Sequence, residues 1–187
     1  MMNIIGGEKR GAKLAACTSA AVRPTAQRTR EALFNILQGG RYAVSVQKAL
    51  VIDLFAGTGA VGLEALSRGA DKCVFVEQDR DALHTLNTNI SRLGMQDKAL
   101  VLAQDAGSLS RWSSAPAELV FADPPYDSDL AGQALSRLAD IKAIYQQTLI
   151  VVETRKTEPC LLGPQFTQTD SRTYGIARLN FFHLTDS

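Results

Sequence analysis

The stretch from Val51 to Leu66, VIDLFAGTGAVGLEAL, constrains the fold more than any other part of the chain. It runs from apolar residues interrupted by Asp53, through a turn with Gly57 and Gly59, into an amphipathic segment. A buried strand, a glycine turn and a helix in this order form the first βα unit of a nucleotide-type α/β sheet. Glycine reaches positive φ and carries no Cβ atom, so a ligand can lie directly on the main chain of this turn.

The charge of Asp53 decides which ligand the turn favours. Gly57, Gly59 and Gly62 match the dinucleotide pattern G-x-G-x-x-G, and Glu77 lies 20 residues after Gly57. A carboxylate near the end of the strand would repel a pyrophosphate. It would attract the sulfonium and ammonium groups of S-adenosylmethionine, directly or through water. We therefore predict S-adenosylmethionine, and not NAD, as the cofactor.

The length and composition predict one α/β domain in the cytoplasm. The chain has 187 residues, of which 45% are hydrophobic, and this suffices for a single core. It contains no run of 18 apolar residues and no apolar segment typical of a signal peptide. Cys17, Cys73 and Cys160 are widely spaced, which argues against a disulfide framework and against a metal site; Cys73 is expected in a core strand. We therefore expect no metal.

The basic residues gather in the first 41 residues. This part holds seven Lys or Arg against two Glu, a balance of +5, whereas the rest of the chain has a balance of −4. Such asymmetry is typical of a phosphate-contacting arm on a catalytic body, although a solvated basic face explains the same pattern. The residues predicted to contact phosphates are Lys9, Arg10, Lys13, Arg23, Arg28 and Arg30.

Two elements are expected in this basic region. Residues 3–16 read as a β-hairpin or a flexible arm, with a tip made mobile by its glycines. A helix should follow over about 26–37. Its apolar stripe is expected at Ala32, Leu33, Ile36 and Leu37, with the arginines on other faces.

Acids also follow the next two predicted strands. Glu77 ends KCVFVE, where a carboxylate can accept both ribose hydroxyls of an adenosine. Asp105 follows ALVLA; it can accept from the adenine amino group, and the Ala106 amide can serve a ring nitrogen. Taken alone, Asp105 could equally cap a short turn. The predicted cofactor-binding residues are Asp53, Phe55, Gly57, Gly59, Glu77, Gln78, Asp105, Ala106 and Asp123.

A fourth strand, ELVFA, leads into Asp123-Pro124-Pro125-Tyr126. Two consecutive prolines fix φ and remove two N–H donors, so Asp123 and the Pro124 carbonyl form two acceptors in a rigid frame. Beside the Tyr126 ring, this frame suits a planar group that bears an exocyclic amine. We predict Asp123, Pro124, Pro125 and Tyr126 as catalytic residues. The remaining sequence, after Tyr126, predicts a helix over 129–143, a strand over 148–153 and a pair of antiparallel strands over 166–174 and 177–184.

With the glycine turn and Asp-Pro-Pro-Tyr together, the chain resembles the class I S-adenosylmethionine-dependent methyltransferases that modify exocyclic amines. More narrowly, it is similar to the RsmD family, bacterial enzymes that methylate the N2 amine of one guanine in small-subunit (16S) ribosomal RNA. The segments that carry this resemblance are IIGGEKRGAKL, RPTAQRTREALFNIL, DLFAGTGAVGLEALSRGA, FVE, DPPY, IVVE and the final YG. Gln27 departs from the family, many members of which carry an acid there.

The resemblance implies a Rossmann-like α/β fold. We expect a mostly parallel seven-stranded sheet with an antiparallel C-terminal edge strand and an N-terminal β-hairpin arm. Residues 1–41 would form an RNA-binding extension and residues 42–187 the methyltransferase domain. It further implies that Asp53, Gly57 and Gly59 surround the methionine part, with Glu77 at the ribose and Asp105 at the adenine. Asp123 to Tyr126 would hold the target guanine.

The implied partner is small-subunit ribosomal RNA within an assembling or assembled 30S particle. We expect the protein to act as a monomer and not to bind a membrane. Three other functions fit part of the pattern. An adenine-N6 DNA or RNA methyltransferase uses a similar proline motif, but normally adds a target-recognition region. A non-catalytic RNA-binding ribosome assembly factor would not need the Asp123 to Tyr126 frame. A dinucleotide oxidoreductase would not place Asp53 at the turn.

Overall fold

The stretch around the glycine turn forms strand β3 (Leu50–Leu54) and helix α2 (Ala60–Ser67), as predicted. The computed structural model describes residues 2–16, 24–125 and 129–185. The following elements are β4 (Lys72–Glu77), α3 (Arg80–Leu93), η1 (Gln96–Lys98), β5 (Ala99–Ala103), η2 (Ala106–Ser108), β6 (Leu119–Ala122), α4 (Leu130–Asp140), β7 (Leu149–Arg155), β8 (Phe166–Tyr174) and β9 (Ala177–Leu184). The bounds predicted for α4 and β7 agree within a few residues, and those of β4, β5, β8 and β9 agree completely.

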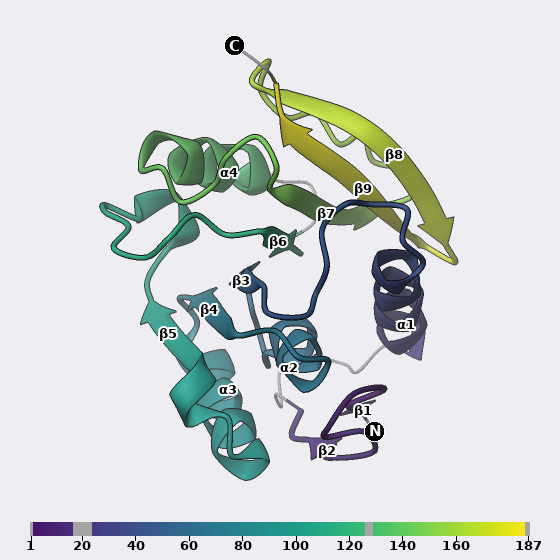
Figure 1. The fold of residues 1–187 in the computed structure, drawn as a ribbon, viewed down its shortest axis with the longest axis vertical. Coiled ribbons are helices and arrows are strands. Elements are labelled where there is room, and N and C mark those ends of the chain that lie inside the picture. The colour runs from purple at the N-terminus through teal and green to yellow at the C-terminus, as the bar shows by residue number, and fades with distance from the viewer. Residues whose placement is uncertain (1, 17–23, 126–128, 186–187) are drawn as a thin grey trace.

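The seven strands form one sheet in the order β5-β4-β3-β6-β7-β9-β8 (Figure 1). Strands β3 to β7 pair in parallel, whereas β9 pairs antiparallel with both β7 and β8. The chain leaves β3 towards β4 and β5, and later returns to the other side of β3 as β6. The prediction of a mostly parallel seven-stranded sheet with an antiparallel C-terminal edge is confirmed.

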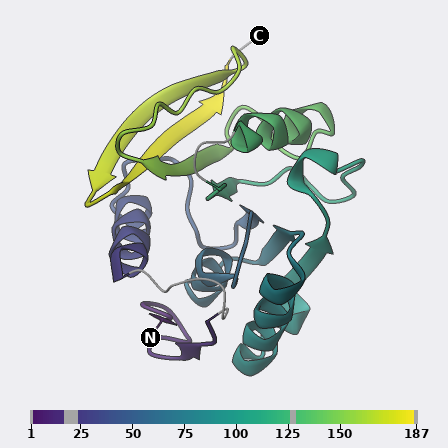
Figure 2. The same cartoon turned by 180° about the vertical axis from the view of Figure 1, so that it is seen from behind.

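Helices cover both faces of the sheet, and the alternation of side chains along each strand decides which core they enter. In β3, Val51 packs in one core with α1 (Pro24–Gln38), α2 and α3. Its neighbours Ile52 and Leu54 pack in a second core with α4 and η2. Figure 2 shows α4 on the opposite side of the sheet from α1, α2 and α3. Among the described residues, no helix has the length and apolar content to cross a bilayer.

Helix α1 buries a different stripe from the one predicted. Its most buried side chains include Arg30, Leu33, Phe34 and Leu37, whereas Ala32 and Ile36 are only half-buried. These four follow the i, i+3, i+4, i+7 spacing of one helix face, and the stripe therefore begins at an arginine. Phe34 packs on Phe121 of β6 with 5.9 Å between ring centroids.

The N-terminal β-hairpin is confirmed, with β1 (Met2–Asn3) antiparallel to β2 (Lys13–Leu14). Its tip, however, is fixed on α2. The Ile5 and Gly6 amides donate to the two carboxylate oxygens of Glu64 at 2.7 and 2.8 Å. The Lys9 amide donates to Ser67 Oγ at 2.9 Å. The expectation of a mobile tip is therefore wrong, because its glycines allow close contact with α2 instead of free movement.

Hairpin and α1 share their core with the sheet. Ile4, Leu14 and Phe34 belong to the same buried cluster as Val51 and Phe121. A boundary at residue 41 thus divides the chain by proposed role and not by core.

Cys73 is fully buried in β4, as predicted, and burial raises the pKa of its thiol. Cys17 lies outside the described residues.

Candidate active site

Four side chains stand at one level of the sheet, directly beyond the last residues that pair β3 with β6 and β6 with β7. Leu54 pairs with Val76 and with Ala122, and Ala122 pairs with Val152. The next residues along these strands are, in sheet order, Glu77, Phe55, Asp123 and Glu153. Strands β4 and β5 lie on one side of β3, and β6 and β7 lie on the other, so the strand order reverses at β3. Ligands of open α/β sheets bind at the carboxyl edge beside such a reversal. Sequence patterns predicted three of the four; Glu153 was missed.

The turn after β3 has positive φ at Phe55 (60°), Gly57 (55°) and Gly59 (80°). A Cβ on Gly59 would lie 2.4 Å from the Leu86 side chain of α3, so glycine is needed for α3 to pack on the turn. A Cβ on Gly57 would meet nothing closer than the Phe55 carbonyl oxygen at 4.0 Å. The main chain at Gly57 therefore borders open space, as a ligand lying on it requires. Positive φ at a non-glycine residue such as Phe55 is uncommon and often marks a functional site.

Asp53 holds the start of α2 against β3. Its Oδ2 accepts a hydrogen bond from the Gly62 amide at 2.9 Å, and the residue is only 4% exposed. Burial raises the pKa of the Asp53 carboxyl to about 8; the Gly62 hydrogen bond opposes this rise, and the charges of Asp123 and Glu77 add to it. A nearby cation would favour the ionised form. Contact between Asp53 and the methionine part of a cofactor stays a prediction.

Glu77 joins the end of β4 to the glycine turn. Its Oε2 accepts from the Gly57 amide at 2.7 Å, and its Oε1 accepts from the Gln78 and Asp79 amides, both at 2.8 Å. A carboxylate that accepts several amide hydrogen bonds is held in one orientation. Glu77 therefore stands preset beside Gly57, where the sequence predicts the ribose.

The β5 side supplies the last two predicted cofactor residues. Asp105 is half-buried at the start of η2 and accepts from Ser108 Oγ at 2.8 Å, while Ala106 beside it is buried. Asp105 thus stabilises a short turn, the alternative that the sequence left open, and an adenine contact stays a prediction.

Among the described residues, no group of three His, Cys, Asp or Glu side chains could hold a metal ion. The acids at this edge fit a large organic cation such as S-adenosylmethionine.

The target side follows β6. Asp123 and Pro125 are exposed and Pro124 is buried. Tyr126 lies outside the described residues, so its predicted stacking role stays a prediction. The charge of Asp123 contributes to the raised pKa of Asp53, which shows that the two carboxyl groups are near one another. Pro124 and Pro125 also line a cavity of about 240 Å³ between β7 and the loop that follows it.

The predicted RNA contacts divide by burial. Arg10, Lys13 and Arg28 are exposed, and half-buried Lys9 pairs with Glu8 at 2.9 Å. Arg23 lies outside the described residues. Arg30 is only 4% exposed; its guanidinium lies 3.8 Å from Glu64 and donates to the Asn3 carbonyl at 2.6 Å. The prediction that Arg30 binds RNA is therefore wrong, because its charge is used inside the fold.

Two buried polar residues that sequence analysis missed connect the hairpin to the rest. Glu64, fully buried, accepts from Arg68 Nε at 2.7 Å as well as from the hairpin amides. Asn89 of α3, also fully buried, exchanges hydrogen bonds with the main chain of Ala15 at 2.7 and 3.2 Å. Asn89 also donates to the Thr58 carbonyl in the glycine turn at 3.0 Å. The end of the hairpin and the cofactor turn are thus joined through one side chain.

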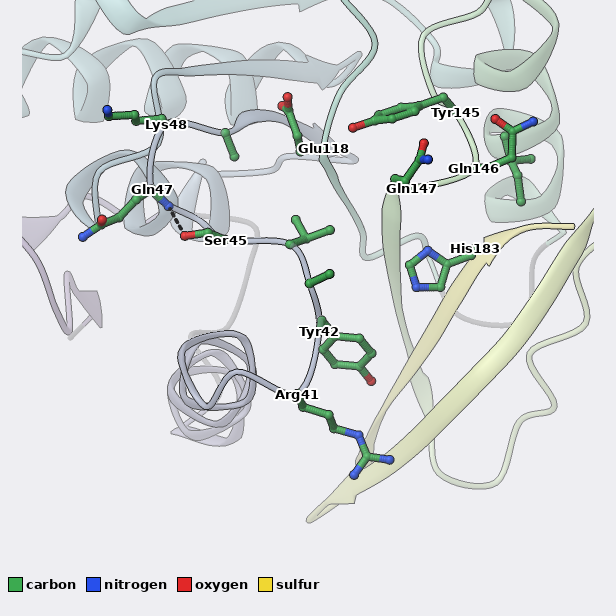
Figure 3. Close-up of a pocket in the computed structure, with 14 residues that line it drawn as sticks. Arg41, Tyr42, Ser45, Gln47, Lys48, Glu118, Tyr145, Gln146, Gln147 and His183 are labelled. Atoms are coloured by element: carbon green, nitrogen blue, oxygen red, sulfur yellow. Dashed lines mark hydrogen bonds between the residues drawn. The ribbon is translucent and has the colours of Figure 1, made fainter. Parts of the chain in front are cut away.

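A larger cavity of about 780 Å³ lies at the opposite edge of the sheet (Figure 3). Ala49 and Glu118, which line it, directly precede β3 and β6, and therefore belong to the amino edge. Glu118 accepts from the Leu50 amide at 2.7 Å, and His183 Nδ1 lies 2.9 Å from the Thr148 carbonyl. These contacts give both side chains a structural role. Asp123, Pro124 and Pro125, which the sequence predicts for methyl transfer, follow β6 at the other edge.

Comparison with known proteins extends over nearly the whole chain. Residues 2–183 match the family described as "Conserved hypothetical protein 95". A Haemophilus influenzae protein named ribosomal RNA small subunit methyltransferase D is 34% identical over 184 residues, covering 97% of this chain and 93% of the relative. An Escherichia coli protein of the same name is 38% identical over 153 residues, covering 82% and 74%. The solved structure of the Escherichia coli protein yhhF has a TM-score of 0.82 at 30% identity, covering 100% of this chain and 99% of its own.

Proposed function

The chain belongs to the family described as conserved hypothetical protein 95, the RsmD family predicted from its sequence, and on this premise we propose its reaction. It transfers a methyl group from S-adenosylmethionine to small-subunit ribosomal RNA. The acceptor is the exocyclic N2 amine of one guanine. The observation that carries this proposal is the position of Asp123-Pro124-Pro125 beside the glycine turn, on the strand next to β3.

The open main chain at Gly57 and the ends of β4 and β5 would hold the cofactor. Glu77 and Asp105 offer acceptors for its ribose and adenine, and Asp53 supplies negative charge beneath the turn once a bound cation favours its ionised form. Gln78 and Ala106 contribute main-chain groups. Phe55 borders this site at the sheet level shared by Glu77 and Asp123.

Bound S-adenosylmethionine supplies an electrophilic methyl group on a positively charged sulfur. The chain has to hold the amine nitrogen in line with that group. The lone pair of a guanine N2 amine is delocalised into the ring, and hydrogen bonds from its N–H groups to Asp123 and the Pro124 carbonyl weaken this delocalisation. Tyr126 stacks on the base. The released proton passes to Asp123 or to water.

The basic residues of the hairpin and α1 that are not buried bind RNA phosphates. Lys9, Arg10, Lys13 and Arg28 remain as contacts, together with Arg23 from the sequence prediction. We further propose that the chain acts as a monomer in the cytoplasm, without a metal, on RNA within an assembling or assembled 30S particle. The basic charge of residues 1–41 supports an RNA partner.

The test is methyl transfer from labelled S-adenosylmethionine to naked ribosomal RNA, assembled small subunits and DNA. Nucleoside digestion of the product should give labelled N2-methylguanosine from RNA and no label in DNA. Labelled N6-methyladenosine would support the adenine alternative instead. RNA binding without any incorporation would support the non-catalytic assembly factor.

A further inference from the structure

A cavity of about 240 Å³ lies beside the proline motif, directly after Asp123 in the sequence. Pro124 and Pro125 form one side, and Val152 and Glu153 of β7 form another. Leu162, from the loop after β7, adds a further apolar surface. Pockets that hold whole drug-sized ligands or cofactors measure roughly 300–1,000 Å³, so this smaller space suits a single planar base.

The sheet register places a second carboxylate next to Asp123. Ala122 of β6 and Val152 of β7 are paired in parallel, and Asp123 and Glu153 are the next residues along each strand. Neighbouring strands lie about 4.8 Å apart, and paired positions present their side chains to the same face of a sheet. Glu153 is therefore the closest β7 position to Asp123 along the carboxyl edge. It also lines the same cavity as the two prolines.

Two adjacent carboxylates complement the edge of only one common RNA base. Guanine presents its N2 amine next to the N1–H group, so two neighbouring groups both donate. Adenine and cytosine present an amine next to a ring nitrogen that accepts. A carboxylate facing that nitrogen would meet a second acceptor, which leaves both without a hydrogen.

We propose that Glu153 accepts the N1–H of the target guanine while Asp123 accepts from its N2 amine, which makes Glu153 the residue that selects guanine over adenine. This inference rests on the proposed function. It gives a role to the IVVE segment, which ends in Glu153 and to which the methyl-transfer scheme assigns none. It also provides a physical reason for guanine methylation by a proline motif that the rival adenine-N6 enzymes use in a similar form.

Glu158 provides a matched control in the same cavity. It lines the cavity from the loop after β7, but its Oε1 lies 3.6 Å from Arg155 Nε, and its own amide donates to the Arg155 carbonyl at 3.0 Å. Its carboxylate thus belongs to a local turn and lies outside the β6–β7 register. A change at Glu158 alters the charge of the cavity by the same amount without removing the acceptor next to Asp123.

The experiment compares guanine with 2-aminopurine at the methylated position, in ribosomal RNA ligated from synthetic pieces. 2-Aminopurine keeps the amine, but its N1 accepts and carries no hydrogen. We expect the wild-type chain to methylate guanine at least about a hundredfold faster in single turnover, as sites built to bind an N–H reject analogues that lack it. In Glu153→Gln the side-chain amide can donate or accept, so this ratio should fall to within about tenfold. Glu158→Gln should keep the wild-type ratio, and cofactor affinity should not change in either variant.

A wild-type ratio near one would overturn the inference without any variant, even if Glu153→Gln failed to fold. An unchanged ratio in folded Glu153→Gln would overturn it as well. Both results leave guanine methylation by the wild-type chain intact. Failure of the proposed function is distinct, because the wild-type chain would then methylate no guanine in any RNA.

Discussion

The two halves of the carboxyl edge differ in how their main chain is held. In the half that we propose binds the cofactor, here called the cofactor half and formed by β3, β4 and β5, side-chain carboxylates accept from the amides of Gly57 and Gly62. In the half that we propose binds the target base, here called the target half and formed by β6 and β7, Pro124 and Pro125 have no amide hydrogen, and Asp123 is exposed. The first half is shaped before any ligand arrives. In the second half, the exposed Asp123 carboxylate lies where we propose that the target base binds.

This difference has a chemical reason. A cofactor is used in every turnover, so a preset site avoids the cost of ordering the chain each time it binds. The target base has to be selected from a large polymer, and exposed acceptors are satisfied only by a base with donors in the right places. Four variants test whether the two halves act separately.

The largest effect should come from the target half. Asp123→Ala removes an acceptor for the amine, and we expect the single-turnover rate to fall roughly 10²-fold or more, as losing one positioned polar group commonly does. Cofactor affinity, measured by calorimetry, should stay unchanged. Asp97→Ala, an exposed acid on η1, serves as the control. A wild-type rate in folded, cofactor-bound Asp123→Ala would mean that the amine is held elsewhere.

The next effect concerns the stability of the cofactor half. The Asp53 carboxyl has a pKa of about 8 in the folded chain against an ordinary value of 3.8. Between these values the folded chain keeps a proton that the unfolded chain has lost. Its contribution to the free energy of unfolding is therefore complete below about pH 4 and lost as pH rises towards 8, by at most about 1.4 kcal/mol per pH unit.

Asp53→Asn should remove this pH dependence. Urea unfolding of both proteins at pH 5, 6, 7 and 8 measures it. With each increase in pH, we expect the free energy of unfolding of the wild-type chain to fall relative to that of Asp53→Asn. The control variant Glu31→Gln, on the exposed face of α1, should follow the wild-type curve. Parallel curves for Asp53→Asn and wild type would show that Asp53 is ionised throughout this range.

Glu77→Ala should weaken S-adenosylmethionine binding by about 1–3 kcal/mol, the range for hydroxyl groups that lose their acceptor. It also removes the acceptor of the Gly57 amide, so the preset turn loosens. Calorimetry with S-adenosylmethionine and with NAD checks both the residue and the cofactor. Heat from NAD alone would contradict the assignment of this half. RNA affinity should not change, which would separate the two halves.

The smallest effect should lie outside both halves. Replacing Lys9, Arg10 and Lys13 together by Ala should lower RNA affinity and reduce its salt slope by about two to three units, since each lost phosphate contact removes about 0.7–0.9. The hairpin tip contacts the last turn of α2, whereas the glycine turn lies at its start. The transfer rate should therefore not change. Lys142→Ala, beyond α4, is the control; an unchanged slope in the triple variant would make the arm a solvated face.

Local patterns were enough to predict most of the fold. The glycine turn and the acids at strand ends placed β3, β4 and β5, because period and turn chemistry are local properties. The alignment of Asp123 with Glu153, each one residue beyond the Ala122–Val152 pair, was not predictable in this way. It depends on the register between β6 and β7, which packing sets. Helix α4 separates the two strands in the sequence. The signal available in the sequence was the acid that ends IVVE.

Arg30 shows a second limit. The spacing from Arg30 to Leu33, Phe34 and Leu37 marks one helix face, but a charged residue on an apolar stripe is normally placed outside. Its partner Glu64 lies on a different helix, 34 residues away. A buried ion pair between distant elements leaves no periodic trace in either one. Burial and partner therefore had to come from the structure.

The fixed hairpin tip changes what RNA binding would cost. Ordering the backbone of a flexible residue costs about 1–2 kcal/mol of conformational entropy. In this chain the Ile5, Gly6 and Lys9 amides are already held by Glu64 and Ser67 before any RNA arrives. That entropy is lost when the protein folds and is not lost again when it binds. The few basic residues of the hairpin can therefore act on RNA as a rigid surface, with little loss of chain freedom on contact.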